Sequence, residues 1–177
     1  RGQACPASPT EATLGRPLTS LSRRSHREPV YRLRTLGAID LRDAAGEPVA
    51  ALLQQPRRLA LLAYLACSPR RITSREHLID LLWSDLEPDR ARHALRQTVW
   101  YLRQLLGTEG LVTRGDSLEL TTPIDLDRDQ FLAAVENGEL ARAAGLYRGD
   151  FLAEFAAPGG VEFEHWADVE RQRLRSI

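Results

Sequence analysis

The residues best suited to chemistry lie on one face of a helix that the sequence predicts over residues 88–106. With about 3.6 residues per turn, this spacing puts Arg92, Arg96 and Arg103 on one ridge. Beside the ridge lie His93, Gln97, Trp100 and Gln104. Arginine can grip phosphate or pair with guanine, glutamine can pair with adenine, and tryptophan can pack on sugar or a thymine methyl group. This face therefore indicates contact with a DNA groove.

The charge of this segment supports that interpretation but leaves an alternative open. Residues 88–106 hold four arginines against one acid, Asp89. A solvent-exposed helix face, whose arginines only offset neighbouring acids, would show the same distribution of residues around the helix axis. The candidate DNA-contacting residues on this helix are Arg92, Arg96, Gln97, Trp100 and Arg103.

A further candidate, Arg114, lies in a hairpin predicted over residues 111–121. The flanks of this segment alternate in polarity, and Gly115-Asp116 between them suits a tight turn. Arg114 at the tip could place a cation on the minor groove or on the phosphate backbone. Asp116 beside it is unfavourable for such a contact. A hairpin that follows two helices in this order is the wing of a winged helix–turn–helix.

The search for catalytic and metal-binding residues finds no complete constellation of nucleophile, base and orienting group. Glu162 and His165 have the spacing of a carboxylate-bridged metal site, but the sequence lacks the second copy that such a site needs. Cys67 lies in an apolar helix, where a core position is expected. We therefore expect no enzymatic activity, no metal and no cofactor.

The elements that must position the helix and hairpin begin near residue 30. Residues 1–29 contain four prolines and no apolar period, which predicts a disordered tail. Alternation from Tyr31 to Leu41 predicts a half-buried strand or pair, and residues 49–53 a further short strand. A small antiparallel sheet should therefore open the domain.

Three helices should follow. Pro56 suits the first turn of an apolar helix that ends at Ser68-Pro69. Thr73 and Glu76 have the spacing of a capping box for a second helix that stops near Trp83. The backbone amides at this start could also donate to a phosphate. Pro88 then opens the third helix, and Gly107 ends it.

Beyond Pro123 the sequence predicts short, paired, acidic helices. They cover about 127–136 and 139–147, then a piece at 151–155, and a last helix with Phe163, Trp166 and Val169 on one side. The predicted fold is an α+β winged helix–turn–helix at 30–124, followed by an all-α, tetratricopeptide-like segment at 125–177.

Composition bounds the function further. The chain has 177 residues and no net charge, yet residues 30–124 carry +2 and residues 125–177 carry −5, so the halves should meet different partners. Two cysteines and no long apolar run predict a cytoplasmic protein without a membrane span. A first residue of Arg1 and the absence of Met indicate part of a longer protein.

Several motifs together resemble the Streptomyces antibiotic regulatory protein (SARP) family. They are Pro56-Arg57-Arg58-Leu59-Ala60-Leu61-Leu62-Ala63-Tyr64-Leu65, Thr73-Ser74-Arg75-Glu76-His77-Leu78-Ile79-Asp80-Leu81-Leu82-Trp83 and Ala91-Arg92-His93-Ala94-Leu95-Arg96-Gln97-Thr98-Val99-Trp100-Tyr101-Leu102-Arg103. Residues 127–131, 146–152 and 164–174 are similar to the start of that family's bacterial transcriptional activator domain. The wing departs from the family, whose aromatic Gly-Tyr-x-Leu strand is replaced here by Asp116-Ser117-Leu118-Glu119-Leu120.

The resemblance implies a response-regulator-type winged helix that reads a promoter in double-stranded DNA, with helix 88–106 in the major groove. It implies a helical domain, cut short at Ile177, for dimerisation or regulation, and a link at 84–88 that contacts RNA polymerase. Our first hypothesis is a sequence-specific transcriptional activator, a homodimer in its full-length form. The alternative is a protein–protein interaction module of a larger signalling protein, whose winged domain no longer binds DNA.

Overall fold

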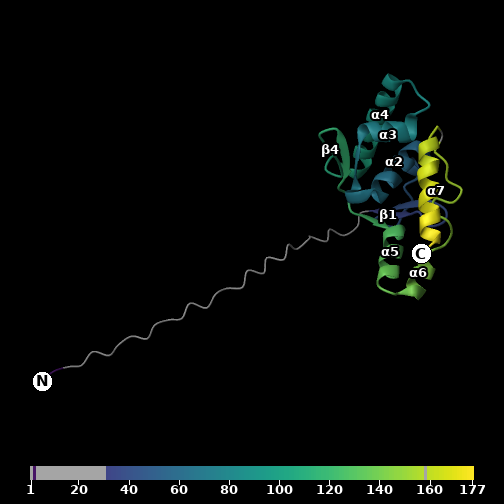
Figure 1. Ribbon diagram of the computed structural model, residues 1–177. Coiled ribbons are helices and arrows are strands. Elements are labelled where there is room, and N and C mark those ends of the chain that lie inside the picture. Colours follow the sequence, from purple (N-terminus) through teal and green to yellow (C-terminus); the bar gives the residue numbers. More distant parts are fainter. Residues whose placement is uncertain (1, 3–30, 158) are drawn as a thin grey trace.

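The computed structural model describes residues 2, 31–157 and 159–177, and its elements are arranged around the helix α2 (Figure 1). The predicted tail at 1–29 lies outside these residues, Gly2 excepted. The strands are β1 (Tyr31–Arg34), β2 (Asp40–Asp43), β3 (Ile72–Ser74), β4 (Leu111–Arg114), β5 (Ser117–Leu120) and β6 (Ile124–Leu126). The α-helices are α1 (Ala50–Leu53), α2 (Pro56–Cys67), α3 (Arg75–Trp83), α4 (Pro88–Leu106), α5 (Asp127–Glu136), α6 (Leu140–Leu146) and α7 (Val161–Arg175).

The strands form two three-stranded sheets. In the first, of order β2-β1-β6, β1 pairs antiparallel with β2 but parallel with β6. The second, of order β3-β5-β4, is antiparallel and contains the predicted hairpin. The parallel β1–β6 pair brings chain segments more than ninety positions apart into register, with Tyr31 opposite Ile124. Such a long-range pair has no local sequence signal.

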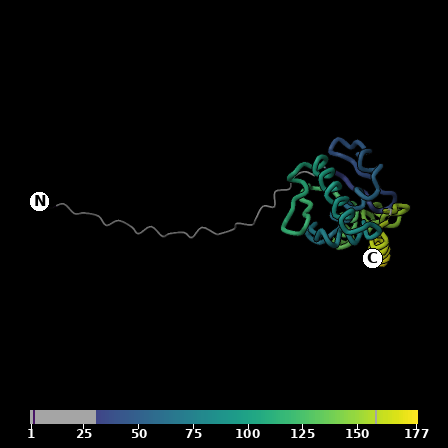
Figure 2. The backbone as a smooth tube through the Cα atoms, turned by 90° about the horizontal axis from the view of Figure 1, so that it is seen from above, coloured from purple at the N-terminus to yellow at the C-terminus, as the bar shows by residue number. Residues whose placement is uncertain are grey.

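The fold class predicted from the sequence, an α+β winged helix followed by a helical segment, is confirmed. Pro56 does begin α2, which is buried on nearly every side and stands at the centre of one continuous core. The hairpin and α7 lie on opposite sides of the body in both Figure 1 and Figure 2. The wing is therefore well separated from the C-terminal helix.

Three local predictions are wrong. Residues 50–53 form the short helix α1 instead of a strand. Thr73 does not cap α3, because it is extended in β3 opposite Leu118, and Ser74 caps the helix by accepting a hydrogen bond from the backbone N–H of His77 (3.2 Å). The piece at 151–155 is not helical, since Phe151 and Ala153 bridge to the β1–β2 connection.

The buried face of α7 also differs from the prediction. Phe163 is buried and Trp166 is half-buried, but Val169 is 52% exposed. Positions 163, 167, 170 and 174 face the core instead. Glu170 can occupy a core position because Arg128 of α5 donates to its carboxylate at 2.6 Å.

The helical segment is joined to the winged helix by a carboxylate at the start of α5. Asp127 accepts hydrogen bonds from the backbone N–H of Thr35 (2.8 Å) and of Leu36 (3.0 Å), and from the Thr35 hydroxyl (2.9 Å). An aromatic contact also joins the two parts, because the ring of Trp166 in α7 packs edge-on against the ring of Tyr64 in α2. The division into domains at 30–124 and 125–177 remains a prediction.

Candidate nucleic-acid interface

Helix α4 presents one face to the core and the opposite face to solvent. Pro88 occupies its first turn, and Gly107 follows it with a φ of 81°, a backbone conformation that glycine adopts without steric cost. Its buried residues are Ala91, Leu95, Thr98, Val99 and Leu102. This packing fixes which side chains point outward, and they include most of the candidate residues.

Three candidates on α4 are exposed and have no partner among the described residues. Arg96, Gln97 and Trp100 make no hydrogen bond or ion pair with any residue that the structure describes, and Trp100 is 63% exposed. An exposed tryptophan leaves a large apolar surface in contact with water. A guanidinium without an acceptor in the protein can bind water or an external anion. These three side chains are therefore available for an external ligand.

Arg92 is exposed as well, but it is paired locally. Its Nη1 atom donates to the carboxylate of Asp89 at 2.8 Å, one turn earlier, with 56% of the arginine side chain exposed. An exposed pair of this kind is worth about 0–1 kcal/mol and exchanges readily for another anion. Arg92 is thus available in competition with Asp89.

Arg103 is held against the wing. It is half-buried, its Nε atom donates to the carbonyl of Leu111 (2.8 Å), and its Nη2 atom donates to Thr113 Oγ1 (3.0 Å). Arg75, at the first position of α3, donates to the same hydroxyl oxygen at 3.2 Å. Two arginines from α3 and α4 therefore meet at Thr113 and set the position of the hairpin.

The hairpin tip carries both signs of charge. Arg114 is exposed, and its Nε atom donates to the carboxylate of Glu119 at 2.7 Å, which raises the pKa of its guanidinium. Asp116 is exposed beside it, and its backbone carbonyl accepts from the N–H of Arg75 at 2.9 Å. The tip is thus less basic than Arg114 alone would make it.

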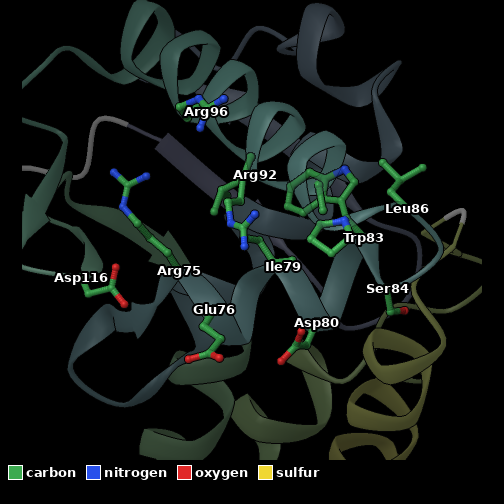
Figure 3. A pocket seen from close by; sticks show the side chains of 13 residues that line it. Arg75, Glu76, Ile79, Asp80, Trp83, Ser84, Leu86, Arg92, Arg96 and Asp116 are labelled. Carbon is green, nitrogen blue, oxygen red and sulfur yellow. The ribbon is translucent and has the colours of Figure 1, made fainter.

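A groove of about 590 Å³ lies between α3, α4 and the hairpin. Figure 3 shows Arg75, Arg92 and Arg96 around its opening, with Asp116 beside Arg75. Glu76 and Asp80 extend from α3 on the side away from Arg96. The groove is therefore basic along α4 and at the first residue of α3, and acidic along the outer side of α3 and at Asp116 of the wing.

Arg75 is the residue that the sequence did not single out. It follows the cap residue Ser74, at the helix start where an amide contact with phosphate was considered. Its position in the first turn of α3 was the available signal, since side chains there lie beside the exposed N–H groups of the helix.

The structure gives no second candidate of catalytic or metal-binding type within its described part. No group of three or more His, Cys, Asp and Glu side chains among the described residues is placed to hold a metal ion. Glu162 and His165 lie instead beside a shallow cavity with Tyr64 and His77, whose Oη and Nε2 atoms are 2.8 Å apart. None of the helices described has the length and apolar character needed to span a membrane.

Comparisons with known proteins agree with the winged-helix fold. Residues 50–114 match the family "Transcriptional regulatory protein, C terminal", which covers α1 to the end of β4. The regulatory protein AfsR of Streptomyces griseus is 31% identical over 136 residues, a match that covers 67% of this chain and 13% of that protein. The chain thus spans a small part of this relative's length.

A solved structure has the same fold over most of the chain. The Mycobacterium tuberculosis protein EmbR, solved in complex with a low affinity phosphopeptide, superimposes with a TM-score of 0.64 at 23% identity. The likeness covers 84% of this chain and 43% of EmbR. Residues 50–114 therefore form a winged-helix domain of the transcriptional regulatory C-terminal type, and the match to AfsR supports the resemblance of the chain to the SARP family.

Proposed function

We propose that this chain binds double-stranded DNA, with α4 in the major groove and the β4–β5 hairpin beside it. The observation that carries the proposal is the exposed row of Arg96, Gln97 and Trp100 on α4, none of which has a partner among the described residues. The major groove of B-DNA admits a helix, and arginine and glutamine match the edges of guanine and adenine.

The six candidate residues differ in the intramolecular contacts that they make. Arg96, Gln97 and Trp100 would contact the DNA directly, and Arg92 would exchange Asp89 for a phosphate. Arg114 would reach the backbone only by giving up Glu119, and Arg103 would act by holding the wing. Arg75, which lines the groove between the wing and α4, joins the set as a candidate phosphate contact.

Fluorescence anisotropy of labelled duplexes across a range of salt concentrations tests the proposal. Each phosphate neutralised by the protein adds about −0.9 to the slope of log K against log salt. The double variant Arg92→Ala/Arg96→Ala should therefore bind more weakly, with a slope shallower by up to about 1.8 if both side chains contact phosphate. A weaker preference among sequences with an unchanged slope would assign them to bases.

The matched control is Arg142→Ala/Arg148→Ala, which also removes two exposed arginines, within and just after α6, at the end of the molecule far from α4 (Figure 1). It should leave both affinity and slope unchanged. If the folded chain binds no duplex at low salt, or if the control loses as much affinity as the double variant, the proposed interface is wrong.

We further propose that the protein activates transcription, as a homodimer in its full-length form. The loop between α3 and α4 would contact RNA polymerase. Its residues Ser84, Asp85 and Glu87 are exposed, and Arg57 of α2 donates to the Asp85 carboxylate at 2.6 Å, which holds the loop in place. A reporter assay with Glu87→Ala, which should lower expression without changing DNA affinity, tests this contact.

A second function, a protein-interaction module without DNA binding, has one specific observation in its favour. Arg92, Arg103 and Arg114 already have acceptors within the chain, and Asp116 stands at the wing. The same anisotropy experiment separates the two functions, because a protein-interaction module would show no binding to duplex and hence no slope.

A further inference from the structure

A second basic site lies away from α4, in a cavity of about 550 Å³. Its walls come from three parts of the chain: the connection between α2 and β3, the start of α5, and the last turns of α7. Four arginines line it, namely Arg70, Arg71, Arg128 and Arg173. The groove beside α4 is lined by three.

The arginines outnumber the acids that could neutralise them. Asp129 lines the cavity, Glu170 lies against two of the arginines, and the charge of Asp127 also acts on the cavity residue Cys67, so four positive charges face three negative ones. The Cys67 thiol itself is uncharged, because burial raises its pKa to about 12. The cavity therefore keeps an excess of one positive charge.

The contacts of the four side chains show which of them can accept a ligand. Arg128 is engaged by two carboxylates, Glu170 at 2.6 Å and Asp129 at 3.0 Å. Arg71 donates to the backbone carbonyls of Ile124 (3.1 Å) and Thr122 (3.5 Å), which bear no net charge. Its guanidinium is thus oriented without being neutralised, apart from a long contact of 3.9 Å with Asp129.

The two remaining arginines are the most accessible. Arg173 uses its Nη1 atom on Glu170 at 3.1 Å, which leaves its other N–H donors unused, and 53% of its side chain is exposed. Arg70 is exposed and makes no hydrogen bond or ion pair in the part of the chain that the structure describes. Arg70 lies on the connection between α2 and β3, and Arg173 lies on α7, so the two side chains line the cavity from different elements.

The backbone at this point is strained. Arg70 and Arg71 have φ values of 56° and 57°, in the left-handed region that residues other than glycine, asparagine and aspartate rarely adopt. Neighbouring residues in that conformation are costly, and such strain is concentrated at functional sites. Here it accompanies two consecutive arginines on one cavity wall.

We propose that this cavity binds the phosphate group of a small phosphorylated molecule. Arg70 and Arg173 contact the phosphate oxygens, Arg71 supplies an oriented positive charge, and Arg128 stays in its ion pair beneath them. Guanidinium groups bind phosphate through paired N–H donors, and the cavity volume lies within the range of about 300–1,000 Å³ usual for small-molecule sites. The bound phosphate would link α7 to the connection that precedes α3.

Calorimetric titration of the whole chain with inorganic phosphate and with pyrophosphate, at constant ionic strength, tests the proposal. We expect saturable binding that the double variant Arg70→Ala/Arg173→Ala weakens at least tenfold. The charge-matched control Arg142→Ala/Arg148→Ala, which changes two exposed arginines outside the cavity, should bind like the parent. Equal weakening in the control, or no saturable binding by the parent, would overturn the site.

Two further measurements keep the test decisive. Arg70→Gly removes the backbone strain at position 70 together with the side chain, so it should raise the thermal midpoint while weakening phosphate binding. Duplex binding by the double variant should keep the parent's salt slope. A slope shallower by about 0.9 or more would make these arginines DNA contacts and refute the small-molecule site, whether or not α4 also binds DNA.

Discussion

Helices α4 and α7 use the same residue type in opposite ways. On α7, Arg171 donates to the carbonyls of Phe151 (2.7 Å) and Leu152 (3.2 Å), and Arg175 donates to the carboxylate of Asp150 (2.7 Å). On α4, Arg96 has no acceptor within the described chain, and Arg92 has only an exposed neighbour. Arg171 and Arg175 on α7 hold the fold, whereas Arg92 and Arg96 on α4 leave charge for an external partner.

The difference follows from the acids around each helix. Residues 125–177 hold eleven acids against six arginines, so an arginine on α7 finds a carboxylate nearby. Residues 88–106 hold a single acid, so most arginines there cannot be neutralised within the helix. Arg103 breaks the pattern, because the wing supplies it with a carbonyl and a hydroxyl. Charge count therefore predicts availability until a second element packs against the side chain.

The largest effect is expected where an α7 carboxylate is buried. Arg128→Ala leaves Glu170 without its main partner, and losing one member of a buried pair costs about 3–5 kcal/mol. The free energy of unfolding from urea titration should fall by that amount. Arg173→Ala, which removes an exposed partner of the same carboxylate, should cost below about 1 kcal/mol. Equal losses would mean that Glu170 is not held mainly by Arg128.

A smaller loss of stability is expected for Arg171→Ala. Its guanidinium donates to two carbonyls beside Leu152, whose φ of 50° is left-handed, so the variant loses the contacts that hold this segment. Hydrogen bonds from a charged donor are worth about 1.5–3 kcal/mol, and we expect a loss in that range by urea titration. DNA affinity should stay unchanged, and a parallel drop in affinity would contradict the division of roles between α7 and α4.

Arg103→Ala tests whether this arginine of α4 acts by holding the wing. Because Arg103 holds the wing, the variant should bind duplex DNA about threefold more weakly, below the tenfold change that 1.4 kcal/mol would give, with the parent's salt slope. Thr113→Val removes the shared acceptor and should reproduce the effect. Faster amide exchange at β4 would report the loosened wing directly. A slope shallower by about 0.9 would instead make Arg103 a phosphate contact.

The smallest effect is expected for the exposed pair of Arg175 and Asp150. The hydrogen bond from Arg175 holds the pKa of Asp150 below its usual value of 3.8. A carboxyl whose pKa is lowered by folding stabilises the protein above its unfolded pKa, and this contribution is lost as the pH falls through the folded value. Arg175→Gln should therefore be slightly less stable at pH 7, and equal to the parent in strong acid or high salt. The thermal midpoints of the parent and the variant, measured at pH 7 and in strong acid, give this difference.

Elements whose signals are local could be predicted from the sequence. Pro56 and Pro88 mark the starts of α2 and α4, and Gly107 marks the end of α4. Periodicity also placed Arg96, Gln97 and Trp100 on the outer face of α4, because the buried stripe of a helix is a property of its own residues. DNA contact by these residues remains a prediction.

Which polar groups meet depends on the packing of the whole chain and has no local signal. No local sequence pattern predicts that Thr113 accepts hydrogen bonds from both Arg75 and Arg103. The same is true of the burial of Glu170 against Arg128 and of the pairing of β6 with β1. For the same reason Ser74 instead of Thr73 became the cap of α3, since pairing with β5 claimed Thr73. Local propensity selects an element, but partners distant in sequence are brought together only by the packing of the whole core.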